Sequence, residues 1–201
     1  MKKKLLSVSL AVIIAVMAIS GASLAWLQDT TQTVTNTFTE GLVDIDLWEY
    51  DYVQSTNTLD TSTKVTSESD YKMIPGNVLP KNPTVTVKAN SEACYVFVKI
   101  VESTNFKTFM EYKVDSKWTA LGDAYPGVYY MELDALTAAD TDYTVLEAVD
   151  AYTTGAVTVK NTVTMKDMTD NTVDPTLSFT AYAIQQLGFA DAAAAWAEIG
   201  A

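Results

Sequence analysis

Short segments in which apolar and polar residues alternate recur along the chain, and turn-forming residues separate them. Residues 42–50 show the pattern clearly. Val43, Ile45 and Leu47 take every second position, with aspartates between them. A period of two places alternate side chains on opposite faces of a β-strand. These segments therefore predict strands that bury one face and expose the other.

Other segments predict strands on similar grounds. The segment 93–101 is apolar on both faces apart from Lys99, which is typical of a strand in the centre of a covered sheet. Residues 54–70 are polar and predict an exposed loop or a weak hairpin. Asp191 is expected to cap a short helix over 192–199. The remaining predicted strands are 84–88, 106–114, 128–133, 143–149, 156–165 and 177–184.

About eight to ten short strands without long helices between them indicate an all-β fold and argue against a parallel sheet. We expect an antiparallel, jelly-roll-like β-sandwich with a short C-terminal helix. The abundance of threonine, with 28 residues, fits half-solvated strand faces. The residues predicted to form the core are Val43, Ile45, Leu47, Val96, Val98, Phe179 and Trp196.

The first 25 residues have the pattern of a secretory signal peptide. Three lysines precede an apolar stretch over residues 5–19, and small residues lead to Ala25. Cleavage is expected between Ala25 and Trp26. The alternative is an uncleaved anchor, because Trp26 and Leu27 extend the apolar stretch towards the roughly 20 residues of a membrane span.

Residues 26–40 predict a strand-like arm at the new N-terminus. Val34 and Phe38 share one face, and threonines occupy the other. The proposed assembly residues of this arm are Trp26, Leu27, Val34 and Phe38. The expected organisation is therefore a signal peptide over 1–25, a donor-strand arm over 26–40 and a β-sandwich domain over 41–201.

Charge narrows the range of partners. The net charge is −12, and it becomes −15 when the three leader lysines are removed. The chain has no arginine, and its other lysines are scattered. Nucleic acids and anionic membranes need clustered cations, so neither is an expected partner after cleavage.

Candidate catalytic and metal-binding residues are few. Cys94 is the only cysteine and lies in an apolar segment, so we expect a buried side chain rather than a nucleophile. The chain has no histidine, which argues against a zinc protease. Only carboxylates could then serve as zinc ligands, and they bind zinc with poor selectivity. Glu49 and the aspartates near it fit a solvated strand face. We predict no enzyme activity, no metal and no cofactor.

Two further groups have competing interpretations. Asp167, Asp170 and Asp174 fit a solvated acidic loop better than a weak calcium site, because the glycine and closing glutamate of an EF-hand are missing. A set of aromatic residues fits strand packing better than a carbohydrate platform. These aromatic residues are Trp118, Tyr125, Tyr129 and Tyr130.

Three groups of residues, in this order along the chain, resemble the TasA/camelysin family of secreted bacterial proteins. They are spread over most of the chain, whereas residues 54–70 and 115–174 match no motif of the family. The first group begins at the expected cleavage position, the second surrounds Cys94, and the third ends in the C-terminal helix. The matching segments are 25–30 and 36–45, then 74–77, 81–85 and 93–100, then 179–186, 188–189 and 195–196.

The resemblance implies a jelly-roll-like subunit of extracellular biofilm-matrix fibres, located in the matrix or at the cell surface. It also implies release by a SipW-type signal peptidase, then self-association in which the arm of one subunit completes the sheet of the next. Other matrix subunits are possible partners. The alternatives are an accessory or anchoring subunit or adhesin, and a camelysin-type surface metalloprotease, which the absence of histidine disfavours.

Overall fold

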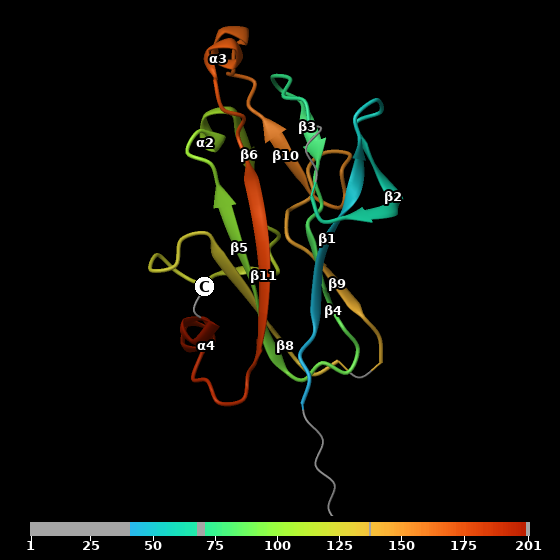
Figure 1. The fold of residues 1–201 in the computed structure, drawn as a ribbon, viewed down its shortest axis with the longest axis vertical. Coiled ribbons are helices and arrows are strands. Elements are labelled where there is room, and N and C mark those ends of the chain that lie inside the picture. The colour runs from blue at the N-terminus through green and yellow to red at the C-terminus, as the bar shows by residue number, and fades with distance from the viewer. Residues whose placement is uncertain (1–40, 68–70, 137, 200–201) are drawn as a thin grey trace, which may run out of the picture. The chain divides into compact units, whose positions relative to one another are not determined.

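The computed structural model describes residues 41–67, 71–136 and 138–199 (Figure 1). Of these residues, 42% lie in strands and 12% in helices, and the paired strands are antiparallel. The predicted mostly-β class is therefore confirmed. The predicted signal peptide, its cleavage position and the arm over residues 26–40 lie outside the described residues.

The first sheet has the strand order β2-β1-β4-β9. It contains β1 (Ile45–Val53), β2 (Thr58–Val65), β4 (Thr84–Val87) and β9 (Thr141–Thr144). β1 and β2 form a hairpin, so the segment 54–70, which was expected to be an exposed loop or a weak hairpin of its own, instead contributes one strand that pairs with β1. The first half of β1 pairs with β4 and its second half pairs with β2.

The second sheet has the order β11-β5-β8-β7. It contains β11 (Leu177–Gln185), β5 (Cys94–Glu102), β8 (Val128–Leu133) and β7 (Thr119–Ala120). β5 pairs along its length with β11 on one side and with β8 on the other (Figure 1). The central position predicted for this segment is confirmed.

A third, smaller sheet has the order β3-β10-β6. Its strands are β3 (Val78–Pro80), β10 (Ala156–Val159) and β6 (Met110–Tyr112). In the described residues, three short helices accompany the sheets: α2 (Phe106–Phe109), α3 (Met165–Asp170) and α4 (Ala192–Ile199).

One main hydrophobic core draws residues from all three sheets. Val96 and Val98 of β5 are fully buried in it, and so is Val85 of β4. Val43, Ile45, Leu47 and Phe179 are partly buried and pack against this core. The core positions predicted from alternation are thus correct for both β1 and β5.

A second, smaller core lies on the opposite face of β5, where α4 packs. Phe97 points to this face because successive side chains of a strand alternate. Its ring centroid lies 5.2 Å from that of Trp196, and the Tyr182 ring meets Trp196 edge-on at 5.3 Å. The predicted cap is present, since the Ala194 N–H donates to Asp191 Oδ1 at 2.8 Å.

The prediction of a strand over residues 106–114 was wrong in its first part. Residues 106–109 form one helical turn, α2, and the strand begins at Met110. Phe106 and Phe109 are both buried. Residues three apart lie on one face of a helix, so a helical turn buries both rings against the core, whereas a strand would point them to opposite faces.

The prediction of a strand over 156–165 was also wrong beyond Val159. Thr164 instead caps α3, because its hydroxyl accepts from the Asp167 N–H at 3.2 Å while the Asp167 carboxylate accepts from the Thr164 N–H at 2.8 Å. This reciprocal pair is a capping box. The acidic segment at 167–170 is consequently helical and not a loop.

The segment predicted as a strand over 143–149 is shorter and shifted. β9 covers residues 141–144, and Leu146 makes only an isolated bridge with Val114. Val145 and Leu146 are nevertheless both buried. Two consecutive buried side chains break the alternation on which the prediction depended.

Replacing Trp196 by alanine should destabilise the protein by about 3–5 kcal/mol, because it removes the largest side chain of the second core and leaves a cavity. Urea unfolding followed by circular dichroism would measure the loss. Leu187→Ala is the control, because Leu187 is 85% exposed and should change the free energy of unfolding by less than about 0.5 kcal/mol. Equal effects from the two substitutions would contradict the assigned role of α4.

Candidate functional site

β11 is an edge strand whose outer side is unpaired among the described residues. The Gln186 N–H donates to the Ala93 carbonyl and the Ser103 N–H donates to the Thr176 carbonyl, both at 2.9 Å. Hydrogen bonds alternate in an antiparallel pair, so even-numbered residues of β11 bond to β5. The N–H and C=O groups of the odd-numbered residues, from Leu177 to Gln185, point away from β5.

The first half of β1 has a similar open side. The Lys88 N–H donates to the Asp44 carbonyl at 2.9 Å, and the Tyr50 N–H donates to Asn82 Oδ1 at 3.0 Å. The backbone N–H and C=O groups of the even-numbered residues of β1 therefore point towards β4. The N–H and C=O groups of Ile45 and Leu47 point the other way, where β2 has not yet begun to pair.

The open sides of β1 and β11 lie beside each other (Figure 1). Between them is a cavity of about 950 Å³, here named the β1–β11 cavity. Leu47 and Glu49 line it from β1, and Leu177 and Phe179 line it from β11. Most other lining side chains are apolar. They include Leu79, Phe106, Met110, Val157, Met73 and Met168.

A buried ion pair lies in the wall of this cavity. Lys81 Nζ donates to both carboxylate oxygens of Glu49, at 2.8 and 3.1 Å. Both side chains are only 12% exposed. Glu49 is thus not on a solvated strand face, as its sequence neighbours suggested, because it shares the inward face of β1 with Leu47.

The backbone of Lys81 is also fixed. Its N–H donates to the Gly155 carbonyl at 3.1 Å. Gly155 has a φ of +115°, and a Cβ atom there would lie 2.7 Å from the Lys81 carbonyl oxygen. Only glycine allows this close approach. Lys81 is consequently held at both ends: Gly155 binds its backbone N–H, and Glu49 binds its ammonium group.

Two aromatic rings lie close to the Lys81 ammonium. Nζ is 5.2 Å from the ring centroid of Tyr71 and 5.8 Å from that of Phe179. Both distances fall within the range of cation–π attraction. Tyr71 is itself stacked on Tyr52 at 4.3 Å. The cavity therefore combines largely apolar walls with a buried ammonium group that has two aromatic rings beside it.

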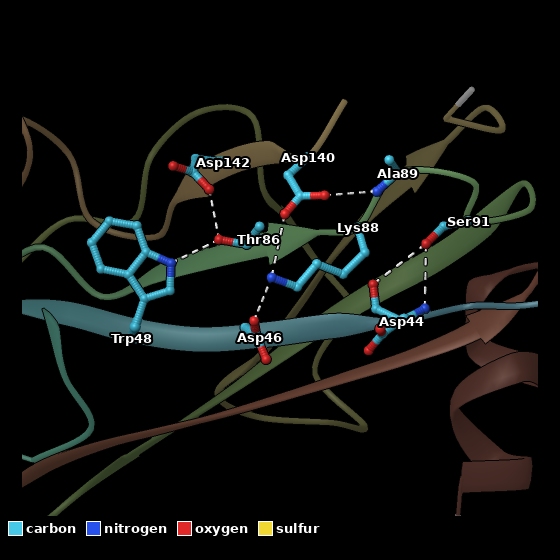
Figure 2. A network of polar contacts seen from close by, with 9 residues as sticks. All are labelled: Asp44, Asp46, Trp48, Thr86, Lys88, Ala89, Ser91, Asp140 and Asp142. Atoms are coloured by element: carbon cyan, nitrogen blue, oxygen red, sulfur yellow. Dashed lines mark hydrogen bonds and ion pairs between the residues drawn. The ribbon is translucent and has the colours of Figure 1, made fainter. Parts of the chain in front are cut away.

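The outward face of β1 carries a separate polar network (Figure 2). The Trp48 indole N–H donates to Thr86 Oγ1 at 2.7 Å, and the Thr86 hydroxyl donates to Asp142 Oδ1 at 2.6 Å. This chain of bonds connects β1, β4 and β9 across three strands. Trp48 is 8% exposed, so its indole N–H needs this partner.

Lys88 extends the network along β4 (Figure 2). Its ammonium lies 2.5 Å from Asp46 and 3.3 Å from Asp140, and these contacts raise the pKa of Lys88, the bond to Asp46 most strongly. The Ala89 N–H donates to Asp140 at 2.9 Å and lowers the pKa of that carboxyl. The network links β1 to β4 and β9 through side chains, and it does not use the backbone N–H and C=O groups on the open side of β1.

Asp174 lines the cavity. Most of the other candidate residues in the described part of the chain lie apart from the cavity or are already engaged. Cys94 is buried, and burial raises the pKa of its thiol, which disfavours the reactive thiolate. Asp167 takes part in the helix cap, and Asp170 pairs with Lys166 at 2.5 Å. The described part of the chain contains no group of three potential ligands arranged to hold a metal ion.

The aromatic residues considered as a carbohydrate platform do not share a face. Tyr129 packs against the main core and Tyr130 against the second core, because they are consecutive in β8. Trp118 is buried, and its indole N–H donates to the Thr144 carbonyl at 3.0 Å. The packing interpretation is confirmed for Trp118, Tyr129 and Tyr130, and Tyr125 packs against the second core as well.

Sequence reasoning missed Lys81 and Glu49 as a pair. A signal for Glu49 exists, since it continues the odd-numbered series of Val43, Ile45 and Leu47. A charged residue on an otherwise apolar face predicts a buried partner. The identity of that partner depends on the distant segment around Lys81, which periodicity cannot bring into contact.

No family model, no curated protein and no solved structure matches this chain. Within the described ranges, the helices are too short or too polar for a membrane span. The assignment of function therefore depends on the geometry of the cavity and on the sequence of the chain.

Replacing Lys81 by methionine should destabilise the protein by about 3–5 kcal/mol, because it leaves the buried carboxylate of Glu49 without its partner. The double variant Glu49→Leu/Lys81→Met should recover most of this loss. Urea unfolding would measure both. Lys88→Met is the control: its ion pairs are more exposed, so it should destabilise the protein much less than Lys81→Met does. A double variant as unstable as Lys81→Met would contradict the pairing.

Proposed function

We propose that this protein is a secreted structural subunit of extracellular matrix fibres, with no catalytic role. In this proposal each subunit donates its N-terminal arm, residues 26–40, to the next subunit. Residues 1–25 act as a signal peptide, and cleavage between Ala25 and Trp26 by a SipW-type peptidase frees the arm. The resemblance to the TasA/camelysin family, noted in the sequence, supports the same function.

The observation that carries the proposal is the pair of strand sides, unpaired among the described residues, that flank the β1–β11 cavity. An exposed strand side with free N–H and C=O groups is a template for pairing with another chain. The cavity beside it can take the apolar side chains of the incoming strand. Adding a strand in this way supplies both main-chain hydrogen bonds and side-chain pockets, as in other cases of β-strand addition.

The geometry also indicates where the arm would enter. Some Cα atoms of β1 and β11 lie within 8 Å of each other. A strand placed between two others needs about 9.5 Å, twice the usual spacing. Insertion of the arm therefore begins at the cavity, between Leu47 and Leu177. Further insertion must move β1 and β11 apart where their Cα atoms lie within 8 Å of each other. Until then, the arm can pair with β11 alone.

The arm and the cavity are different surfaces of the same molecule. A contact between two different surfaces repeats from copy to copy and generates an open filament unless the rotation closes a ring. Donated strands would complete a jelly-roll-like sandwich in each subunit. The net charge of −15 after cleavage keeps unassembled subunits apart through electrostatic repulsion and thereby limits premature association.

Negative-stain electron microscopy tests the proposal directly. Purified chains that begin at Trp26 should form filaments, and chains that begin at Phe38 should not, because they lack most of the arm. Filaments from both would move the assembly surface elsewhere. Stable monomers from both would favour an accessory subunit that joins fibres of another protein.

The variant Ala183→Pro should abolish filaments and leave the domain folded. Ala183 points its N–H away from β5, so proline removes a hydrogen bond only from the incoming strand, as it does at exposed strand edges. Sedimentation would measure the assembled fraction and circular dichroism the fold. The control is Thr61→Pro, on the exposed edge strand β2, which should leave assembly unchanged. Filaments from Ala183→Pro would exclude the β11 side as the docking edge.

A further inference from the structure

We infer that the β1–β11 cavity is a recognition pocket for one aromatic side chain, Trp26 of a second copy of this chain. This inference rests on the proposed function and specifies the contact that selects the partner. Its basis is the combination of a roomy apolar cavity, a fixed ammonium group and the composition of the arm.

The walls of the cavity suit a large, flat side chain. Three methionines line it, Met73, Met110 and Met168, and methionine adapts its shape and makes favourable contacts with aromatic rings. The volume of about 950 Å³ leaves room for an indole ring. An indole ring would bury roughly 150–250 Å² of surface there.

The Lys81 ammonium supplies the specificity. Glu49 holds it at 2.8 Å, and the rings of Tyr71 and Phe179 already lie within 6 Å of it. A third ring at the open side of the cavity would complete an aromatic surrounding for this cation. Tryptophan is the best partner for a cation–π contact, and exclusion of water strengthens this contact. An aliphatic side chain of equal size would gain no such contact.

The arm contains two aromatic residues, Trp26 and Phe38, which differ in how far each can extend from Gly41. Trp26 lies fifteen residues before Gly41, which in extended conformation spans about 50 Å, whereas the nine residues of β11 span about 30 Å. Trp26 can therefore extend along the whole of β11 in another copy. Phe38 lies three residues before Gly41, so an extended chain could carry it no more than about 10 Å from that residue.

Methyl NMR of methionine tests this inference without requiring filaments. The acceptor is the chain from residue 26 with Trp26→Ala, labelled at its methionine methyl groups. The probe is a synthetic peptide with the sequence of residues 26–39. The peptide should shift the methyl signals of the three methionines that line the cavity, through the ring current of its tryptophan. Met131, buried in the core away from the cavity, is the internal reference.

Three peptides separate the possible contacts. The Trp26→Leu peptide should bind about tenfold more weakly and produce no ring-current shift. The Phe38→Leu peptide is the matched control and should behave like the natural sequence. With Glu49→Leu/Lys81→Met added to the acceptor, the preference for tryptophan over leucine should disappear, as expected for directly coupled groups. If this acceptor still preferred the tryptophan peptide over the leucine peptide, Lys81 would not be the group that selects tryptophan.

The outcomes for the pocket and for the fibre are distinguishable. Filaments from the natural chain without peptide-induced shifts at the three methionines would overturn the pocket and leave strand donation standing. Peptide binding with the expected shifts but no filaments would support the pocket and overturn the fibre. Equal binding of the natural and Trp26→Leu peptides would overturn the choice of Trp26.

Discussion

The rest of the structure depends on β5, which is paired on both sides and buried on both faces. Val96 and Val98 point into the main core, whereas Phe97 between them points to α4. A nine-residue strand of this kind fixes two sheet neighbours and two cores at once. The positions of β11 and β8 follow from its hydrogen bonds, and the position of α4 follows from its outward side chains.

A consequence of this arrangement is that β11 is held firmly on one side and left open on the other. Burying a strand face is favourable through the hydrophobic effect, but it leaves the edge hydrogen bonds to be satisfied by water or by another chain. β1 has the same problem before its pairing with β2 begins at Glu49. The β1–β11 cavity lies between these two sides, which have no strand partner among the described residues, and a buried ion pair lies in its wall.

Much of this fold could be predicted from the sequence. The alternation in β1, the two-sided apolar character of β5 and the cap at Asp191 each have a local physical cause, and each prediction was correct. The strand predicted over 143–149 is shorter and shifted. The other errors include residues 106–109 and 164–170, where a helical turn replaced a strand or loop. There the burial of two phenylalanines and a reciprocal side-chain cap outweighed the β-propensity of the segment.

The sequence by itself determined many of the segments that become strands and the buried faces of β1 and β5, because alternation and capping act over a few residues. It also determined the acidic charge and the absence of histidine. Only the tertiary structure decided that β1 and β11 lie side by side without pairing, and that Lys81 meets Glu49 between them. Those contacts join residues 32 or more positions apart, and they depend on how three sheets close around one core.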